Sequence, residues 1–123
     1  MHDPTPVVYV IKEQVARSDV GPVPFDYTPA MSYGEISFVT QSDMPLHAKS
    51  SVQDKWNEDV RRFVEAYNPE TDFIICTGQP TAIFSAGFAL GQANKNPRFL
   101  VWRREENKYR VVGFDADFHP IGV

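Results

Sequence analysis

Apolar residues along the chain form short runs in some places and follow a helical spacing in others. Runs at 7–11 and 72–76 are rich in β-branched and aromatic residues, which predicts strands buried on both faces. The segment 35–40 alternates apolar and polar residues and predicts a strand with a less buried face. Apolar runs at 99–102 and 109–114 flank a charged turn, so they predict an antiparallel hairpin.

Two segments between these strands have the character of helices. Over 51–67 the apolar residues recur at intervals of three and four, as on one face of a helix. A second helix is predicted at 80–92, where a proline occupies the first helical position. It is apolar on nearly every side, so we expect other elements to cover it on more than one flank. Gly87 and Gly91 are costly within a helix, and close approach by another backbone would explain them.

The order of elements predicts the fold class. Strands and helices alternate through the middle of the chain, which indicates an α/β protein. We expect a mixed, mostly parallel sheet flanked by two helices and ending in the antiparallel hairpin. A length of 123 residues suits one hydrophobic core, so we predict a single domain over 1–123. Its least regular part, 12–34, contains several prolines and glycines and is predicted to be a long loop.

Composition limits the classes of function. The formal net charge of −4 argues against a protein that mainly coats nucleic acid, because that requires excess Lys and Arg. A single cysteine excludes an intrachain disulfide and makes a reducing compartment, the cytoplasm, the natural expectation. No apolar stretch approaches the roughly 18 residues that span a bilayer, and no signal peptide precedes the first strand. We therefore expect neither export nor a membrane partner.

The turn between the third strand and the second helix is a candidate ligand site. Ligands in open α/β sheets bind at the carboxyl ends of strands, and free N–H groups at a helix start attract anions. Thr77, Gly78 and Gln79 are accordingly candidates for binding a phosphate or nucleotide. Neither GxxxxGK[ST] nor GxGxxG occurs here, however, and Pro80 removes one donor. The alternative, which we prefer, is an ordinary strand-to-helix turn.

Candidates for catalysis are few. Cys76 lies where an exposed nucleophile could sit, but Ala82 occupies the position at which a phosphatase-type cysteine site needs arginine. We expect a buried core cysteine instead. The residues His2, His47 and His119 lack metal-ligand spacing, and the carboxylates Asp72, Asp115 and Asp117 are expected to be solvated. We predict no catalytic residue, no metal and no cofactor, and the chain is more simply explained as a non-enzyme.

Basic residues gather toward the end of the chain, where six of the twelve lie within 95–110. The predicted hairpin combines guanidinium and ammonium groups with aromatic rings, a mixture enriched at interfaces and able to stack on nucleic-acid bases. The candidate macromolecule-binding residues are Trp102, Arg103, Arg104, Lys108, Tyr109 and Arg110. The alternative is a solvated turn whose cations pair with Glu105 and Glu106.

The segment that contains both candidate sites resembles small proteins encoded by tailed bacteriophages. The resemblance rests on DFIICTGQP, on the small-residue helix AIFSAGFALGQAN and on the hairpin RFLVWRREENKYRVVGFD. It covers about a third of the chain and carries no biochemical activity, so no catalytic residue is transferred. A phage accessory protein of this size is expected to bind and redirect a host component.

Three hypotheses follow. The first is a phage-type accessory protein, active in the host cytoplasm, that binds and modulates a host macromolecule without catalysis. Its partner is expected to be a protein, and the basic hairpin leaves nucleic acid as an alternative. The second is a Rossmann-like protein that binds a nucleotide or phosphate at Thr77 to Pro80. The third is a structural component that assembles as a homodimer or larger homo-oligomer, through an exposed strand or the apolar helix.

Overall fold

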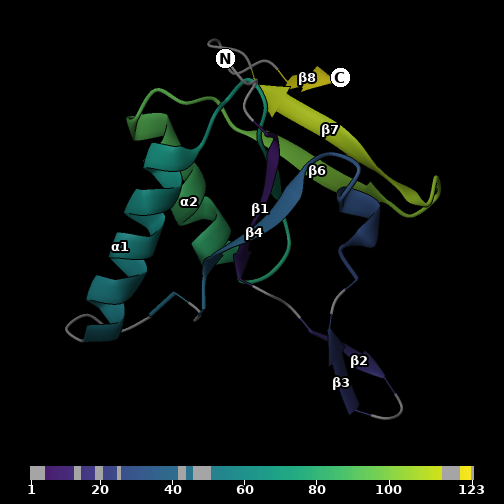
Figure 1. Ribbon diagram of the computed structural model, residues 1–123, viewed down its shortest axis with the longest axis horizontal. Coiled ribbons are helices and arrows are strands. Elements are labelled where there is room, and N and C mark those ends of the chain that lie inside the picture. The colour runs from purple at the N-terminus through teal and green to yellow at the C-terminus, as the bar shows by residue number, and fades with distance from the viewer. Residues whose placement is uncertain are drawn as a thin grey trace.

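A six-stranded sheet forms the centre of the protein (Figure 1). The computed structural model describes residues 5–12, 15–18, 21–24, 26–41, 44–45, 51–114 and 120–122. In spatial order the strands are β4 (Glu35–Thr40), β1 (Val7–Lys12), β5 (Phe73–Ile75), β6 (Arg98–Arg103), β7 (Lys108–Phe114) and β8 (Pro120–Gly122). The first four run parallel, whereas β7 and β8 are each antiparallel to their neighbour. The predicted α/β class, with a mostly parallel sheet and a closing hairpin, is confirmed.

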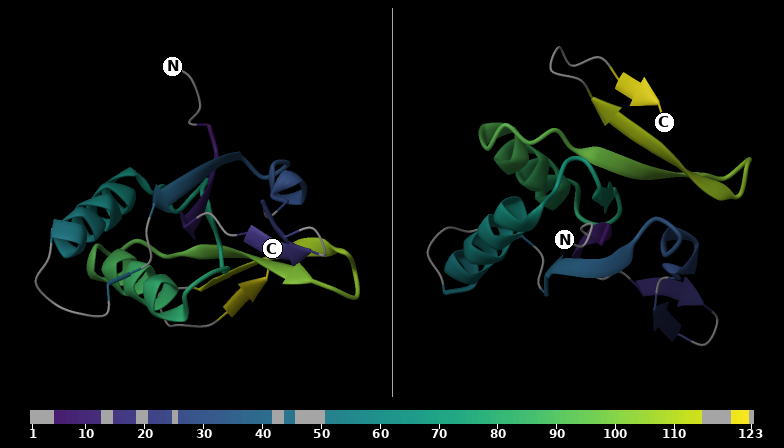
Figure 2. Two further views of the ribbon diagram at one scale, coloured as in Figure 1. Left: turned by 90° about the horizontal axis from the view of Figure 1, so that it is seen from below. Right: turned by 45° about the horizontal axis from the view of Figure 1, so that its top comes forward.

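Both helices lie on the same face of this sheet. α1 (Ser51–Ala66) connects β4 to β5, and α2 (Pro80–Gln92) connects β5 to β6, so both connections move in one direction across the sheet. The connection from β1 to β4 moves in the opposite direction. Because parallel crossovers are right-handed, it must cross the opposite face. Residues 26–34 lie there, on the far side of the sheet from α1 and α2 (Figures 1 and 2).

Each face of the sheet has its own hydrophobic cluster. On the helix face, Tyr9 and Ile11 of β1 pack with the buried side chains of the two helices. On the other face, Val8 and Val10 pack with Tyr27 and with the chain around the short 3-10 helix η1 (Thr28–Ala30). β1 is therefore covered on both sides, which is why its sequence is apolar without alternation.

The segment 12–34, predicted to be a long loop, contains regular secondary structure. It contains a separate two-stranded hairpin of β2 (Val15–Ser18) and β3 (Gly21–Pro24), followed by η1. Pro22 and Pro24 are two residues apart on β3, so the positions at which they lack an N–H group lie on the same side of the strand. A two-stranded ribbon tolerates this because each strand has an outer side that needs no donors. β8 is also absent from the prediction, because three residues bounded by Pro and Gly carry no strand pattern.

The prediction for α2 is right in its bounds and wrong in its burial. Ala82, Ala86 and Leu90 face the core, but Phe84 and Phe88 are 79% and 69% exposed. An apolar helix is ordinarily buried all round, yet the part of the chain that the structure describes covers only one side of α2. The expectation of a close backbone neighbour at the two helical glycines also fails, since a Cβ added at either would meet nothing within 4 Å.

Asp72 is buried, at 3% exposure, and not solvated as expected from its position at a strand end. Its carboxylate accepts hydrogen bonds from the backbone N–H of Val7 at 3.0 Å and of Asn68 at 2.8 Å. The hydroxyl of Thr71 donates a third bond at 3.0 Å. The Asp72 carboxylate therefore joins the start of β1 to the turn between α1 and β5. Without it, the three donors would lose their hydrogen-bond acceptor.

Replacing Asp72 by Asn should lower the free energy of unfolding by about 2 kcal/mol, because one acceptor oxygen becomes an N–H₂ group facing backbone donors. Urea denaturation should show a lower midpoint at an unchanged slope. Glu70→Gln, at an exposed site in the same turn, is the matched control and should change stability by less than about 0.5 kcal/mol. Equal stability of the two variants would contradict the role given to Asp72.

Candidate functional site

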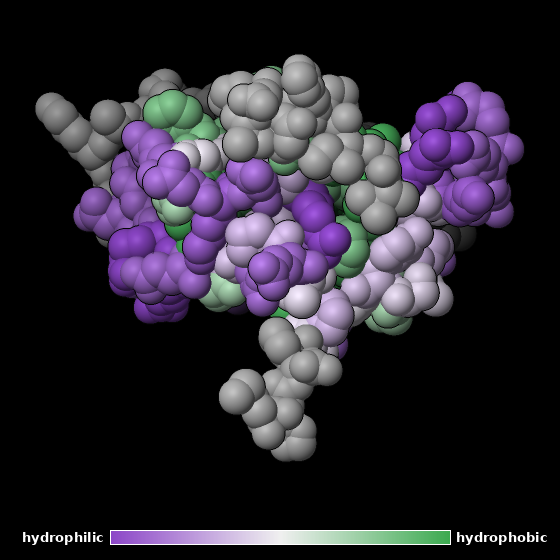
Figure 3. Space-filling model, turned by 90° about the horizontal axis from the view of Figure 1, so that it is seen from above, coloured by the Kyte–Doolittle hydropathy of each residue, from purple (hydrophilic) through white to green (hydrophobic). Residues whose placement is uncertain are grey.

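The β6–β7 hairpin projects beyond the rest of the sheet (Figures 1 and 2). Every residue from 101 to 108 is exposed, and Trp102 retains 42% of its surface in contact with solvent. In the space-filling view the end of this hairpin is a strongly hydrophilic projection (Figure 3). Its position makes it accessible to a large partner.

The strand register divides the predicted binding residues between two faces. Trp102 pairs with Tyr109, and their rings meet edge to face with centroids 5.0 Å apart. Arg103 pairs with Lys108, the next position along each strand. Because side chains alternate across a strand, these two cations lie on the face opposite to the aromatic pair, together with Arg110. The hairpin therefore does not bring the aromatic rings and the strand cations onto one surface.

Most cations of the hairpin have acidic neighbours. Arg110 donates to Glu106 at 3.1 Å, and Lys108 lies 3.9 Å from the same carboxylate. The hydrogen bond from Arg110 is the main reason that the pKa of Glu106 is lowered. Arg103 lies 3.8 Å from Glu105. All these groups are exposed, so the pairs contribute little to stability.

The carbonyl oxygen of Arg104 accepts a hydrogen bond from the N–H of Asn107 at 3.3 Å in the same turn. Its guanidinium group has no hydrogen bond or ion pair to any residue that the structure describes. The hairpin from 103 to 110 carries four cations and two carboxylates, so it is electropositive on a protein whose net charge is −4. Pairing with the two glutamates therefore does not neutralise it.

Two of the six clustered basic residues are structural. The ammonium group of Lys95 donates to the carbonyl oxygens of Val64, Glu65 and Tyr67 at 2.6, 3.1 and 2.9 Å, at the end of α1. The guanidinium of Arg98 lies 4.2 Å from the centre of the Phe73 ring. These two cations complete the fold, so of the six clustered basic residues only the four at 103–110 contribute to the electropositive hairpin.

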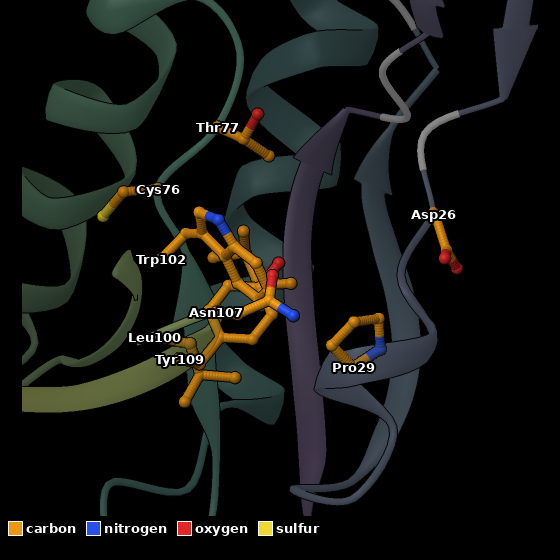
Figure 4. Close-up of a pocket in the computed structure, with 9 residues that line it drawn as sticks. Asp26, Pro29, Cys76, Thr77, Leu100, Trp102, Asn107 and Tyr109 are labelled. Carbon is orange, nitrogen blue, oxygen red and sulfur yellow. The ribbon is translucent and has the colours of Figure 1, made fainter. Parts of the chain in front are cut away.

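A cavity of about 650 Å³ opens at the base of the hairpin, at the carboxyl ends of β5 and β6 (Figure 4). Trp102, Asn107 and Tyr109 gather on one side of it, and Pro29 and Asp26 come from the segment that covers the sheet. The remaining lining residues are Ile75, Cys76, Thr77 and Leu100. Burial raises the pKa of Tyr109, with smaller contributions from Tyr27 and Asp26. None of the described residues that line this cavity is a cation.

The three residues of the predicted phosphate site do not all line this cavity. Thr77 lines the cavity, but Gly78 and Gln79 do not. The side-chain amide of Gln79 accepts a hydrogen bond from the N–H of Met44 at 2.7 Å and donates to the carbonyl of Met44 at 3.3 Å. These two bonds hold the backbone of Met44 beside the start of α2. Gly78 has a φ of 110°, which explains glycine there as a requirement of the turn.

Cys76 is exposed, which corrects the expectation of a buried core cysteine. It ends the strand where the chain leaves the sheet, and in Figure 4 its sulfur points away from Trp102. Nearby apolar groups nevertheless raise the pKa of the thiol to about 11 by desolvation. A reactive cysteine has a lowered pKa, so this environment does not activate it as a nucleophile.

Sequence patterns did not identify Asp26, Pro29 or Asn107 as cavity residues. Asn107 has a φ of 54°, and asparagine within a polar turn is a known signal for that conformation. Asp26 accepts a hydrogen bond from the N–H of Thr28 at 2.9 Å, the short-range contact typical of Asp in a turn. Both signals predict local geometry, but neither predicts which cavity the residue lines.

Among the residues that the structure describes, no three His, Cys, Asp or Glu side chains cluster as a metal site requires. Over the same residues, no helix combines the length and apolar character needed to cross a bilayer. The three histidines, together with Asp115 and Asp117, lie outside the described residues.

The fold and the hairpin define a small α/β protein with an open carboxyl edge. No curated protein matches the chain, and no solved structure does. Residues 6–116 match the family described as Phage Pam3 gp32-like protein, so the chain belongs to this family of phage proteins. The match confirms the resemblance to phage proteins and extends it to the N-terminal half of the chain.

We expect Cys76 to react slowly with iodoacetamide despite its exposure. With the thiol pKa at about 11 and not at its ordinary value of 9.0, the thiolate fraction near pH 8 is lower, by roughly a hundredfold. The alkylation rate should keep rising with pH above 9 where that of a free thiol levels off, and urea should abolish the difference. A rate equal to that of a small free thiol at pH 8 would contradict this prediction.

Proposed function

We propose that this phage protein is a non-enzymatic accessory protein that binds and modulates a host macromolecule through the β6–β7 hairpin. The observation that carries the proposal is the continuous exposure of residues 101–108 on a projecting hairpin. Within that run, Trp102 is 42% exposed and the side chain of Arg104 has no partner among the described residues. Trp and Arg are the residue types most enriched at energetic centres of interfaces.

The charge of the hairpin favours a partner with an acidic surface. Opposite charges accelerate association and exclude partners of the wrong sign. A protein suits the geometry better than single-stranded nucleic acid, because Trp102 lies on the opposite face from Arg103 and Lys108. A nucleic acid would need rings for stacking and cations for phosphates along one path. We place this interaction in the cytoplasm of the host cell.

Reversing the charge of the hairpin should abolish partner binding. Arg103→Glu combined with Arg104→Glu replaces two exposed cations, and neither makes a buried contact that the fold needs. We expect capture of the partner from host lysate to fall by tenfold or more, because like charges then face each other. Quantitative mass spectrometry of the captured proteins measures the loss.

The matched control is Lys55→Glu with Arg62→Glu, which changes net charge equally at two exposed positions on α1. Circular dichroism should show that both double variants remain folded. The control should capture the partner as the native protein does. Unchanged capture by the hairpin variant would refute the proposal, as would an equal loss in the control.

A ligand-binding role is a second candidate, supported by the position of the cavity. β1 and β5 are neighbours whose crossovers leave toward opposite faces of the sheet. Ligands in open α/β proteins bind beside such a switch point, at the carboxyl ends of the strands. Of the described residues that line this cavity, only Asp26 is charged, so an uncharged nucleoside suits it better than a nucleotide or free phosphate.

A thermal-shift panel of nucleosides, nucleotides and inorganic phosphate tests this role. A nucleoside at 100 times its Kd should raise Tm by about 10 °C. Asn107→Gly should reduce the shift, because glycine keeps the positive φ of the turn and removes only the amide that faces the cavity. A flat response, or a shift with phosphate alone, would rule out this nucleoside site.

A further inference from the structure

The exposed face of α2 is explained by neither the hairpin nor the cavity. Phe84 and Phe88, one turn apart, are 79% and 69% exposed, more than any other large hydrophobic side chain among the described residues. No charged residue occurs in Pro80–Gln92. Exposed apolar surface of this kind marks an interaction site, because burying it removes unfavourable contact with water.

A groove of about 620 Å³ runs beside these two rings, between α2 and the sheet. Gly87 and Gly91 belong to its helix side, and Phe99 and Phe114 of β6 and β7 belong to its sheet side. The rings of Phe99 and Phe114 meet edge to face with centroids 6.4 Å apart. The groove is therefore floored by aromatic side chains and bounded by a helix that lacks side chains at two successive turns.

The surface of α2 has the two complementary parts of a helix–helix contact. Phe84 and Phe88 form a ridge of residues four apart, and Gly87 and Gly91 form the adjacent row, which is empty. Helices pack by placing the ridge of one into the groove of the other. A two-fold axis would place the phenylalanine ridge of each copy over the glycines of the other. We propose that α2 is the interface of a homodimer of this chain.

Charge favours a second copy as the occupant. The protein carries a net charge of −4, so two copies repel each other overall. Across α2 no like charges would meet. Among the described residues, Lys95 is the only charged one that lines the groove, and its ammonium group already donates to three carbonyl oxygens of the chain. A partner recognised by its charge would find no complementary group here.

The available area suits a weak dimer. With the exposed fractions given above, the rings of Phe84 and Phe88 offer roughly 300 Å² per copy. Two copies would bury about 600 Å² from these rings alone, and the other groove residues bring the total toward about 1,000 Å². This is the lower range of specific interfaces, so we expect a Kd in the micromolar range.

Light scattering after size exclusion tests the proposal over about 1 to 200 µM protein, a range that spans such affinities. The mass should rise from 14.0 kDa to twice that value. Phe84→Ser with Phe88→Ser should remain monomeric throughout. Met31→Ser removes another apolar side chain, 59% exposed, and should dimerise as the native protein does.

A glycine variant separates dimerisation from stability. Gly87→Ala with Gly91→Ala adds methyl groups that meet nothing within the chain. Alanine favours the helix, so Tm of the dilute monomer should rise by about 5 °C. The same methyl groups fill the space into which the partner's rings insert, so the dimer Kd should increase at least tenfold.

Three outcomes would overturn the dimer. They are a mass of 14.0 kDa at every concentration, unaltered dimerisation of the double serine variant, and an assembly larger than two copies. Unchanged affinity of the alanine variant would refute the packing of phenylalanine over glycine. None of these measurements involves the β6–β7 hairpin, so failure of the dimer would not contradict the proposed function.

Discussion

The buried carboxylate of Asp72 holds together the chain segments on which the sheet depends. It accepts hydrogen bonds from Val7 at the start of β1 and from Asn68 after the end of α1. A charge removed from water is unfavourable unless donors replace its hydration, and here three donors do so. Because Asp72 directly precedes β5, the same contacts help to fix the register in which β1 and β5 pair.

Other polar contacts extend this arrangement along the amino edge of the sheet. Tyr67 donates to the carbonyl of Asp72 at 3.4 Å and accepts from the N–H of Arg98 at 2.9 Å, and burial raises its pKa to about 12. At the start of β4, a Cβ on Gly34 would lie 2.5 Å from the carbonyl oxygen of Pro6. The amino edge is thus closed by close packing and by bonds to the backbone. The carboxyl edge instead carries the cavity and the hairpin.

Local pattern was sufficient to predict most elements, and it failed where tertiary contacts decide the outcome. The bounds of 35–40 and 80–92 were predicted correctly because alternation, proline and apolar content all act locally. The burial of Asp72 was missed because its donors are supplied by segments as distant as Val7. Cys76 was placed in the core because free cysteine is usually buried, a tendency that contains no information about this turn.

The candidate site shows the same division between local and distant information. Basic and aromatic residues of the hairpin were identified from composition, but their separation onto two faces depends on the pairing of Trp102 with Tyr109. Lys95 was counted with the hairpin cations because sequence distance does not show that it reaches the end of α1. In α2, an all-apolar pattern indicates that the helix is covered, but it does not distinguish covering by the same chain from covering by another.

The two proposed surfaces are compatible because they lie on different parts of the molecule. α2 packs over one face of the sheet, whereas the tip of the β6–β7 hairpin extends beyond the carboxyl edge (Figures 1 and 2). A dimer through α2 would therefore carry two free hairpins. Two hairpins on one dimer raise the affinity for a partner, without any new contact at either hairpin, only if the partner offers two binding sites at a matching distance. Under both proposals, a host assembly with repeated subunits would gain more from this arrangement than a partner with a single site.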